Sequence, residues 1–208
     1  MDAAAAIVTL IFVITIFSAA TGGRVAVPGL GGGREATVPI YTNLNVDAVP
    51  DPYFFSVAGE NSQNKIEQYI LKHNKNTSYW DANLYATSMV KYGGMYNVNP
   101  KLVCALIARE SAFNPRSISS SGAMGLGQLL PNTATALNVD DAFDPDQNIR
   151  GTTRYMKFLL EKWKSHPQQV PLSLASYAEG HNAITKNGGY SMKTKGYVED
   201  IIRIYWKI

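Results

Sequence analysis

The sequence contains only one cysteine, Cys104, among its 208 residues. A single thiol excludes both an intrachain disulfide and a cysteine-rich zinc site. The three histidines, His73, His166 and His181, are widely scattered and lack metal-ligand spacing, so neither a metal nor a cofactor is expected. The chain does not need such cross-links, because 46% of its residues are hydrophobic and one domain of this size can bury a stabilising core.

Charged residues are also scarce, at 17% of the chain, and they are unevenly distributed. Residues 60–208 hold 17 of the 19 basic residues and 12 of the 16 acidic ones. This small positive surplus does not indicate a nucleic-acid-binding protein. It would suit contact with a polyanionic matrix such as a cell wall.

The longest uncharged apolar run covers residues 3–20. As a helix it would extend roughly 27 Å, which just spans the hydrocarbon core of a membrane. We therefore expect residues 1–23 to form a membrane anchor. Two alternatives are a secretory signal peptide cleaved after the small residues Ser18, Ala19 and Ala20, and a buried core helix. A signal peptide usually has a basic residue before a shorter apolar run, whereas this long run follows Asp2. Both features disfavour a signal peptide.

Residues 24–59 are rich in glycine and proline and show no helical period, which is typical of a flexible linker. An alternative is that residues 38–46 form a short strand lying along the domain. An anchor would hold the rest of the chain at a membrane, whereas signal cleavage would secrete it.

Residues 60–208 show apolar side chains at spacings of three and four, which predicts an all-α domain of about seven helices. Candidate caps mark several helix starts, among them Asp81, Asn99 before Pro100, and Asp144 before Pro145. The expected helices are one around Ile66, Tyr69 and Ile70, and others over residues 81–96, 100–113, 131–138, 145–163, 171–179 and 194–208.

The position that points to chemistry is Glu110. Val103, Leu106, Ile107 and Glu110 follow one another at helical spacing, so the carboxylate belongs to the apolar face. Desolvation and the negative end of the helix dipole would both raise its pKa, as a general acid requires. The alternative is a structural ion pair with an arginine, with Arg109, Arg116 and Arg150 as the candidates.

A glycine- and serine-rich loop over residues 117–127 precedes Gln128. Glycines allow the backbone to approach a ligand closely, and the Gln128 amide could both donate to and accept from sugar hydroxyl and acetamido groups. Taken alone, the same loop is an ordinary flexible connection.

Together these motifs resemble the soluble-lytic-transglycosylase-like (SLT domain) family of the lysozyme superfamily, whose members cleave bacterial peptidoglycan. Five elements occur in the family's order: ESAFNP at 110–115, GAMGLGQLLP at 122–131, DPDQNIRG at 144–151, LASY at 174–177 and TKGYV at 194–198. The resemblance implies a lysozyme-like helical domain over residues 60–208.

The resemblance also implies roles for particular residues. Glu110 occupies the position of the family's catalytic acid/base. The substrate-binding positions are Ser119, Gln128, Leu130, Thr133, Tyr177 and Tyr197, with Tyr197 also packing and hydrogen-bonding beside the site. For the two tyrosines taken alone, core packing is the simpler interpretation.

The implied reaction is lytic cleavage of the β-1,4 bond between N-acetylmuramic acid and N-acetylglucosamine, giving a 1,6-anhydromuramoyl product without cofactor or metal. The expected partners are peptidoglycan strands, a membrane through residues 3–20, and envelope-spanning or virion assembly proteins, but no nucleic acid. Local wall cutting of this kind fits envelope remodelling, a secretion or conjugation apparatus, or virus entry.

Three departures from the family pattern leave alternatives open. Ala178 and Glu179 follow Tyr177 where the family has Asn-Ala, and Lys193 stands where many members have Glu. Glu179 is therefore a candidate second carboxylate for a hydrolytic muramidase of the same fold. A catalytically idle peptidoglycan-binding or assembly protein is the third alternative.

Overall fold

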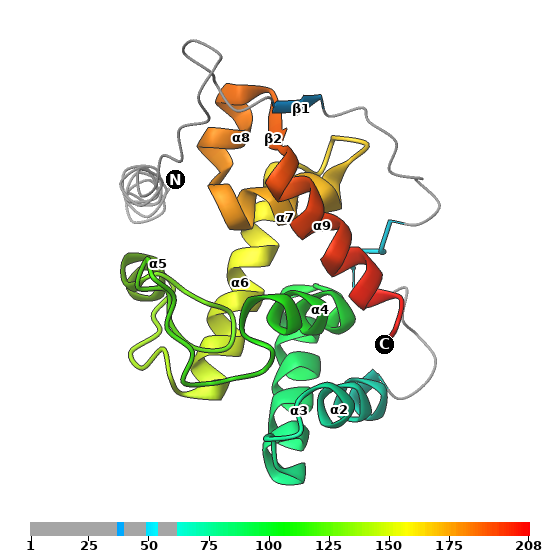
Figure 1. Ribbon diagram of the computed structural model, residues 1–208, viewed down its shortest axis with the longest axis vertical. Coiled ribbons are helices and arrows are strands. Elements are labelled where there is room, and N and C mark those ends of the chain that lie inside the picture. The colour runs from blue at the N-terminus through cyan, green and yellow to red at the C-terminus, as the bar shows by residue number, and fades with distance from the viewer. Residues whose placement is uncertain (1–36, 40–48, 54–61) are drawn as a thin grey trace, which may run out of the picture.

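The computed structural model describes residues 37–39, 49–53 and 62–208, and this part of the chain is almost entirely helical (Figure 1). Its eight helices and two short strands confirm the all-α prediction, with one helix more than expected. The predicted membrane segment lies outside the described residues, and within them no helix is long and apolar enough to cross a bilayer. In chain order the elements are β1 (Thr37–Pro39), α2 (Ser62–His73), α3 (Tyr79–Tyr96), α4 (Pro100–Ser111), α5 (Pro131–Ala136), α6 (Pro145–Lys162), α7 (Gln169–Glu179), α8 (His181–Asn187), β2 (Gly189–Ser191) and α9 (Met192–Tyr205).

Side-chain caps set the starts of four of the described helices, namely α3, α4, α6 and α9. Asn99 and Asp144 cap α4 and α6 as predicted, each followed by a proline in the first turn. The predicted cap of α3 is wrong, because Ser78 rather than Asp81 is the N-cap. The Asp81 amide donates to Ser78 Oγ at 3.1 Å, and Ser78 Oγ donates to the Asp81 carboxylate at 2.7 Å. This reciprocal pair places the N-cap three residues before Asp81, and the helix begins at Tyr79.

The sequence pattern missed α8 and β2, each of which is too short to show a period, whereas β1 overlaps the start of the alternative strand over residues 38–46. β1 pairs antiparallel with β2, with Val38 opposite Tyr190. The β1 strand falls inside the stretch predicted as linker, and residues 40–46 of the alternative strand lie outside the described residues. A second segment of that stretch also contacts the domain: Asn99 donates from its backbone amide to Pro52 O at 2.8 Å and from its side chain to Asp51 O at 3.0 Å.

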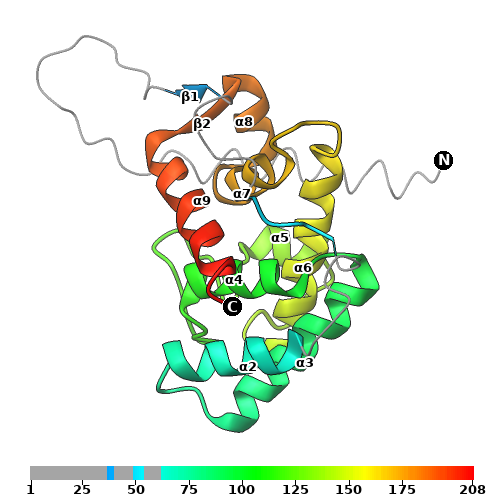
Figure 2. The same cartoon turned by 90° about the vertical axis from the view of Figure 1, so that its right-hand side faces the viewer.

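Helix α4 lies at the centre of the molecule, with α9 crossing it and α6 running from α3 to α7 (Figures 1 and 2). The large core cluster gathers buried side chains of α2, α3, α4, α6, α7 and α9. A smaller cluster, which includes Leu129, Leu137 and Leu159, lies beneath α5 and along α6. Cys104 of α4 is fully buried in this core. The C-terminal end of α4 therefore meets α9 and the loop that leads to α5.

Candidate active site

Glu110 lies in the last turn of α4, where the apolar face of that helix ends. Val103, Leu106 and Ile107 are completely buried, which confirms the predicted core stripe. The Glu110 side chain continues this stripe but is only partly buried, and this burial is enough to desolvate its carboxyl group. An ordinary surface glutamate would instead hold its carboxylate in solvent.

The backbone directly after Glu110 is strained. Ala112 and Phe113 both adopt left-handed conformations, with φ of 49° and 62°. Such conformations cost of order 1 kcal/mol or more each for residues other than glycine and persist only where the surroundings enforce them. Here Asn74 Nδ2 donates to Ala112 O at 2.9 Å, and the Phe113 ring is buried against Tyr69 at a centroid separation of 6.3 Å. The sharp turn thus ends α4 at Ser111, one residue beyond Glu110.

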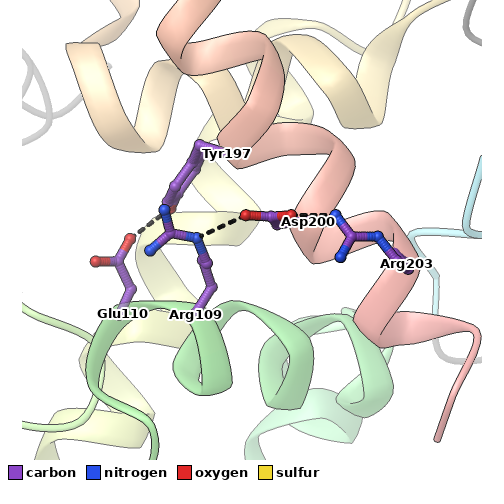
Figure 3. A network of polar contacts seen from close by, with 5 residues as sticks. All are labelled: Arg109, Glu110, Tyr197, Asp200 and Arg203. Atoms are coloured by element: carbon purple, nitrogen blue, oxygen red, sulfur yellow. Dashed lines mark hydrogen bonds and ion pairs between the residues drawn. The ribbon is translucent and has the colours of Figure 1, made fainter.

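Tyr197 of α9 donates its hydroxyl hydrogen to Glu110 Oε1 (Figure 3). The two residues are 87 positions apart in the chain, and the packing of α9 on α4 brings them together. The structure thus contains the hydrogen bond that was predicted for Tyr197 beside the site. A phenol that donates to one carboxyl oxygen leaves the second oxygen to carry or exchange a proton.

Burial raises the pKa of the Glu110 carboxyl above its ordinary value. The hydrogen bond from Tyr197 and the charge of Arg109 both oppose this rise, because each favours the ionised form. The net direction is upward, so Glu110 keeps its proton closer to neutral pH than an exposed glutamate would. That property is required of a general acid.

Tyr177 is the second tyrosine near the carboxyl group. Its hydroxyl donates to Gly127 O at 2.7 Å, and its ring lies 5.2 Å from that of Tyr155. Burial and the charge of Glu110 raise the pKa of both Tyr177 and Tyr197 well above the usual range for phenols. Both hydroxyls are therefore neutral donors at physiological pH, and Tyr177 ties α7 to the glycine-rich loop.

The side chain of Asn148 in α6 forms hydrogen bonds with the backbone of the glycine-rich loop. Its Oδ1 accepts from the Gly127 amide at 2.7 Å, and its Nδ2 donates to Met124 O at 3.1 Å and Ala142 O at 2.8 Å. A Cβ on Gly127 would lie only 1.9 Å from Thr152 Oγ1, so only glycine fits there. The two sequence motifs around Gly127 and Asn148 thus form one unit.

The Gln128 amide was expected both to donate to and to accept from a sugar, but its donor end is already bonded within the protein. Its Nε2 donates to Ser117 O at 3.1 Å and Gly125 O at 2.9 Å, so the donor end of its amide stabilises the loop. Only Oε1 then remains for an incoming sugar group, as an acceptor. The residue adopts a left-handed conformation with φ of 52°, which the tight fold of the loop imposes.

The other predicted substrate-binding residues line the loop and α5. Ser119 Oγ accepts from the Ala123 amide at 3.0 Å, which closes a turn of the loop. Leu130 directly precedes α5 and is half-buried, and Thr133 is buried in the first turn of that helix. Among the described residues, no hydrogen bond or ion pair joins these three to Glu110.

The three arginines considered as ion-pair partners of Glu110 all interact elsewhere. Arg109 Nε lies 3.3 Å from Asp200 Oδ2. Arg116 lies over the Phe143 ring at 5.7 Å, and Arg150 donates to a backbone carbonyl oxygen. Within the described chain, no ion pair forms with Glu110, and the interpretation of Glu110 as a structural ion-pair residue is wrong.

Glu179 lies at the end of α7 and contacts the start of α9. Ser191, the N-cap of α9, donates to Glu179 Oε1 from its Oγ at 3.1 Å and from its amide at 3.4 Å. The Thr194 amide in turn donates to Ser191 Oγ at 3.2 Å. Glu179 is thus engaged at a helix cap, which does not favour the hydrolytic alternative. Serine is a preferred N-cap residue, so Ser191 was a candidate helix start that sequence reasoning could have used.

The Arg109–Asp200 pair also went unnoticed, although Asp200 follows Tyr197 by three positions and so shares its helix face. Ala178 and Lys193, the other two departures from the family pattern, are exposed. Nowhere in the described part of the chain do three or more His, Cys, Asp or Glu side chains gather as a metal site.

Comparison with known proteins identifies proteins that are similar to this chain in sequence. A family profile described as "Transglycosylase SLT domain" matches residues 88–199. A transglycosylase of Enterobacteria phage PRD1 is 37% identical over 108 residues, which cover 52% of this chain and 38% of the phage protein. A membrane-bound lytic murein transglycosylase F of Pectobacterium atrosepticum is 35% identical over 103 residues, covering 48% of this chain and 21% of that protein. The chain thus spans well under half the length of these relatives.

Solved structures give the same fold. The 70 kDa soluble lytic transglycosylase of Escherichia coli aligns with a TM-score of 0.51 at 19% identity, covering 73% of this chain and 31% of that one. An inactive mutant of the lytic transglycosylase Slt from Pseudomonas aeruginosa aligns with a TM-score of 0.50 at 20% identity, covering 57% and 23%. The matched residues 88–199 include Glu110, Tyr197 and the glycine-rich loop between them, and the chain therefore belongs to the Transglycosylase SLT domain family.

Proposed function

We propose that the chain is a peptidoglycan lytic transglycosylase that uses Glu110 as its only acid/base. The observation that carries this proposal is the half-buried Glu110 carboxyl, whose pKa is raised and which accepts a hydrogen bond from Tyr197. Family membership and the transglycosylase names of the relatives support the reaction class.

In the first step the protonated Glu110 donates its proton to the glycosidic oxygen between N-acetylmuramic acid and N-acetylglucosamine. The bond from that oxygen to C1 of the muramoyl residue breaks, and the 2-acetamido group of the same residue stabilises the developing positive charge. The Glu110 carboxylate formed in this step keeps the hydrogen bond from Tyr197. A charge-assisted bond of this type is stronger than a neutral one, so it assists the formation of the carboxylate.

In the second step the Glu110 carboxylate removes the proton of the muramoyl C6 hydroxyl, and O6 forms a bond to C1. The product is a 1,6-anhydro ring, no water is consumed, and Glu110 regains the proton that it lost. A two-carboxylate glycosidase would need a second acid facing the sugar, and Glu179, the candidate from the sequence, is instead bonded to Ser191.

The proposed sugar contacts come from the loop and helix faces around Glu110. The Oε1 atom of Gln128 would accept from a sugar hydroxyl or acetamido group, and Ser119, Leu130 and Thr133 would line the glycan beyond it. Tyr177 and Tyr197 would form the wall on the α7 and α9 side. No cofactor or metal enters this mechanism.

We further propose that residues 3–20 tether the enzyme to a membrane, so that it cuts the wall locally. The membrane-bound and phage relatives support such a setting, with envelope remodelling, a secretion or conjugation apparatus and virus entry as candidate roles. Because β1 is paired with β2, only residues 21–36 separate the proposed tether from the domain. As a random coil these residues would reach roughly 20 Å, which confines cutting to the wall nearest the membrane.

The test is mass spectrometry of the fragments that the purified full chain releases from peptidoglycan. Anhydromuramoyl fragments are expected from the parent chain, and Glu110→Gln should reduce their yield by about 10²- to 10⁴-fold, the usual contribution of a general acid/base. Glu161→Gln, which removes an exposed carboxylate on α6, is the matched control and should leave the yield unchanged.

Fragments heavier by one water would identify a hydrolytic muramidase instead. No fragments from either chain, together with retained binding to peptidoglycan, would identify a binding or assembly protein. Near-full activity of Glu110→Gln would contradict the assignment of Glu110.

A further inference from the structure

Arg109 directly precedes Glu110 and brings a permanent positive charge to the end of α4. A guanidinium next to a carboxyl group favours the ionised carboxylate and works against a general acid. Arg109 has this effect here, because its charge lowers the pKa of Glu110 against the larger upward influence of burial. Where the Arg109 side chain points is therefore important to the chemistry of the neighbouring carboxyl group.

The Arg109 side chain reaches from α4 to α9, where its Nε faces the Asp200 carboxylate (Figure 3). Its Nε lies 3.3 Å from Asp200 Oδ2, and its Cζ lies 5.4 Å from the centre of the Tyr197 ring. Asp200 also accepts from Arg203 one turn further along α9. The guanidinium is thus held by a carboxylate on one side and an aromatic face beneath it.

We propose that Asp200 is a positioning residue that holds Arg109 against α9 and so prevents Arg109 from forming an ion pair with Glu110. Glu110 is then left to its hydrogen bond with Tyr197 and can carry the reactive proton. This inference deepens the proposed function and rests on it for its catalytic meaning. The ion-pair geometry itself can be tested without substrate.

Among the residues that the structure describes, three titratable groups face Glu110, and each comes from a different element. Arg109 belongs to α4, Tyr197 to α9 and Tyr177 to α7. Both tyrosines stay neutral near pH 7 because burial and Glu110 raise their pKa values. Near pH 7, Arg109 is therefore the one charged group of these three, and it forms an ion pair with Asp200.

The test is the titration of the Glu110 carboxyl carbon by NMR in the full chain, with Glu110→Gln to assign the signal. Asp200→Asn keeps the shape of the side chain but releases Arg109, so the pKa of Glu110 should shift downward by roughly half a pH unit, the order expected for one half-exposed charge. The high-pH limb of the rate profile on peptidoglycan should move down by the same amount. Arg109→Gln should move both in the opposite direction.

Glu199→Gln is the matched control, because it removes a carboxylate from the adjacent position of α9 whose partner is Lys195. It should shift the Glu110 titration much less than Asp200→Asn does. A shift of equal size in the control would overturn the proposal, since any acid on α9 would then have the same effect.

The double variant distinguishes an effect through Arg109 from a direct effect of the Asp200 charge. If Asp200 acts by holding Arg109, then Asp200→Asn should cause a clearly smaller shift in the Arg109→Gln background than in the parent chain. Equal shifts in the two backgrounds, or no shift in the parent, would overturn the proposal. If the chain showed no activity on peptidoglycan, the proposed function would fail, whereas the NMR titration would still report on Arg109 and Asp200.

Discussion

Glu110 links the catalytic proposal to the stability of the fold, because its pKa is raised in the folded chain. An unfolded glutamate titrates near pH 4.3, so between that value and the folded pKa the native state binds more protons than the unfolded state. Stability therefore falls as the pH rises through this window and stays lower above it. The Glu110 carboxyl thus weakens the fold at neutral pH, which is the stability cost of the acid that we propose.

We expect Glu110→Gln to be more stable than the parent chain at pH 7.5, by about 1.4 kcal/mol for each unit of the pKa rise. The difference should disappear below about pH 4, where the parent carboxyl is protonated in both states. Urea unfolding at several pH values measures this. Glu161→Gln should show the opposite sign, because Lys157 lowers the pKa of Glu161, and a pH-independent gain for Glu110→Gln would contradict the account.

Tyr197→Phe tests the hydrogen bond to Glu110 without changing the packing of the ring. Loss of the donor removes an influence that lowers the pKa of Glu110, so the high-pH limb of the rate profile should move upward. The rate itself should fall by about tenfold or more, because a hydrogen bond to a charged group contributes about 1.5–3 kcal/mol. Steady-state kinetics from pH 4 to 9 would measure both effects, and an unchanged profile would exclude Tyr197 as a partner of the reacting carboxyl.

The position of Glu110 was predictable from the sequence, because helical spacing alone places it on the apolar face of α4. The contacts that tune it were not predictable in the same way. Tyr197, Asp200 and Arg109 meet only because α9 crosses α4, and no local pattern reports the crossing of two helices separated by about ninety residues. The resemblance to a family supplied Tyr197, but Asp200 is in none of the five matched motifs.

At the scale of the elements, the start of α9 determines where Tyr197 lies. Ser191 caps that helix and is bonded to Glu179 at the end of α7. We expect Ser191→Ala to lower the free energy of unfolding by about 1 kcal/mol, the usual cost of losing an N-cap side chain. Thermal or urea unfolding would check this value.

Glu179→Gln retains an oxygen that can accept from Ser191, so this variant should keep most of the activity and the anhydro product. A catalytic second carboxylate would instead make this variant inactive. Product analysis of Glu179→Gln beside Glu179→Ala therefore separates positioning of α9 from direct catalysis.

The glycine-rich loop depends on close packing against α6. In Gly127→Ala the new methyl group would overlap Thr152 Oγ1, so we expect a loss of stability of about 1–3 kcal/mol and displacement of Gln128. Gly196→Ala is the contrasting variant, because nothing lies within 4 Å of its new Cβ and the position is helical. It should raise stability by about 0.5–1 kcal/mol. Equal effects of the two substitutions in unfolding measurements would contradict this interpretation of the loop.

Helices with capping residues and long apolar stripes were the elements that the sequence predicted well. α4 and α6 begin at Asn99 and Asp144 as expected, because a cap and a following proline act locally. α8 has seven residues and each strand has three, which is too short for a period to be visible. The β1–β2 pairing depends on a contact between residues about 150 positions apart, which no local pattern could indicate.

At the scale of the whole molecule, the domain draws on segments outside the matched residues 88–199. α2 adds Ile66 and Ile70 to the core, and residues 49–53 contact α4 through Asn99. The C-terminal half of α9 beyond the match contributes Ile202 and Tyr205, and Tyr205 accepts from Asn99 at 3.0 Å. The folded domain thus extends beyond the matched residues 88–199. Functional experiments should therefore use the full chain.

The measurement that tests the central claim most directly is mass spectrometry of peptidoglycan digested by the full chain in water enriched in oxygen-18. The account predicts muramoyl ends that lack one water and carry no heavy oxygen, because the C6 hydroxyl of the sugar attacks C1 and Glu110 only transfers the proton. Incorporation of one heavy oxygen into each newly formed end would show that water attacks, and would contradict the single-carboxylate transglycosylase mechanism.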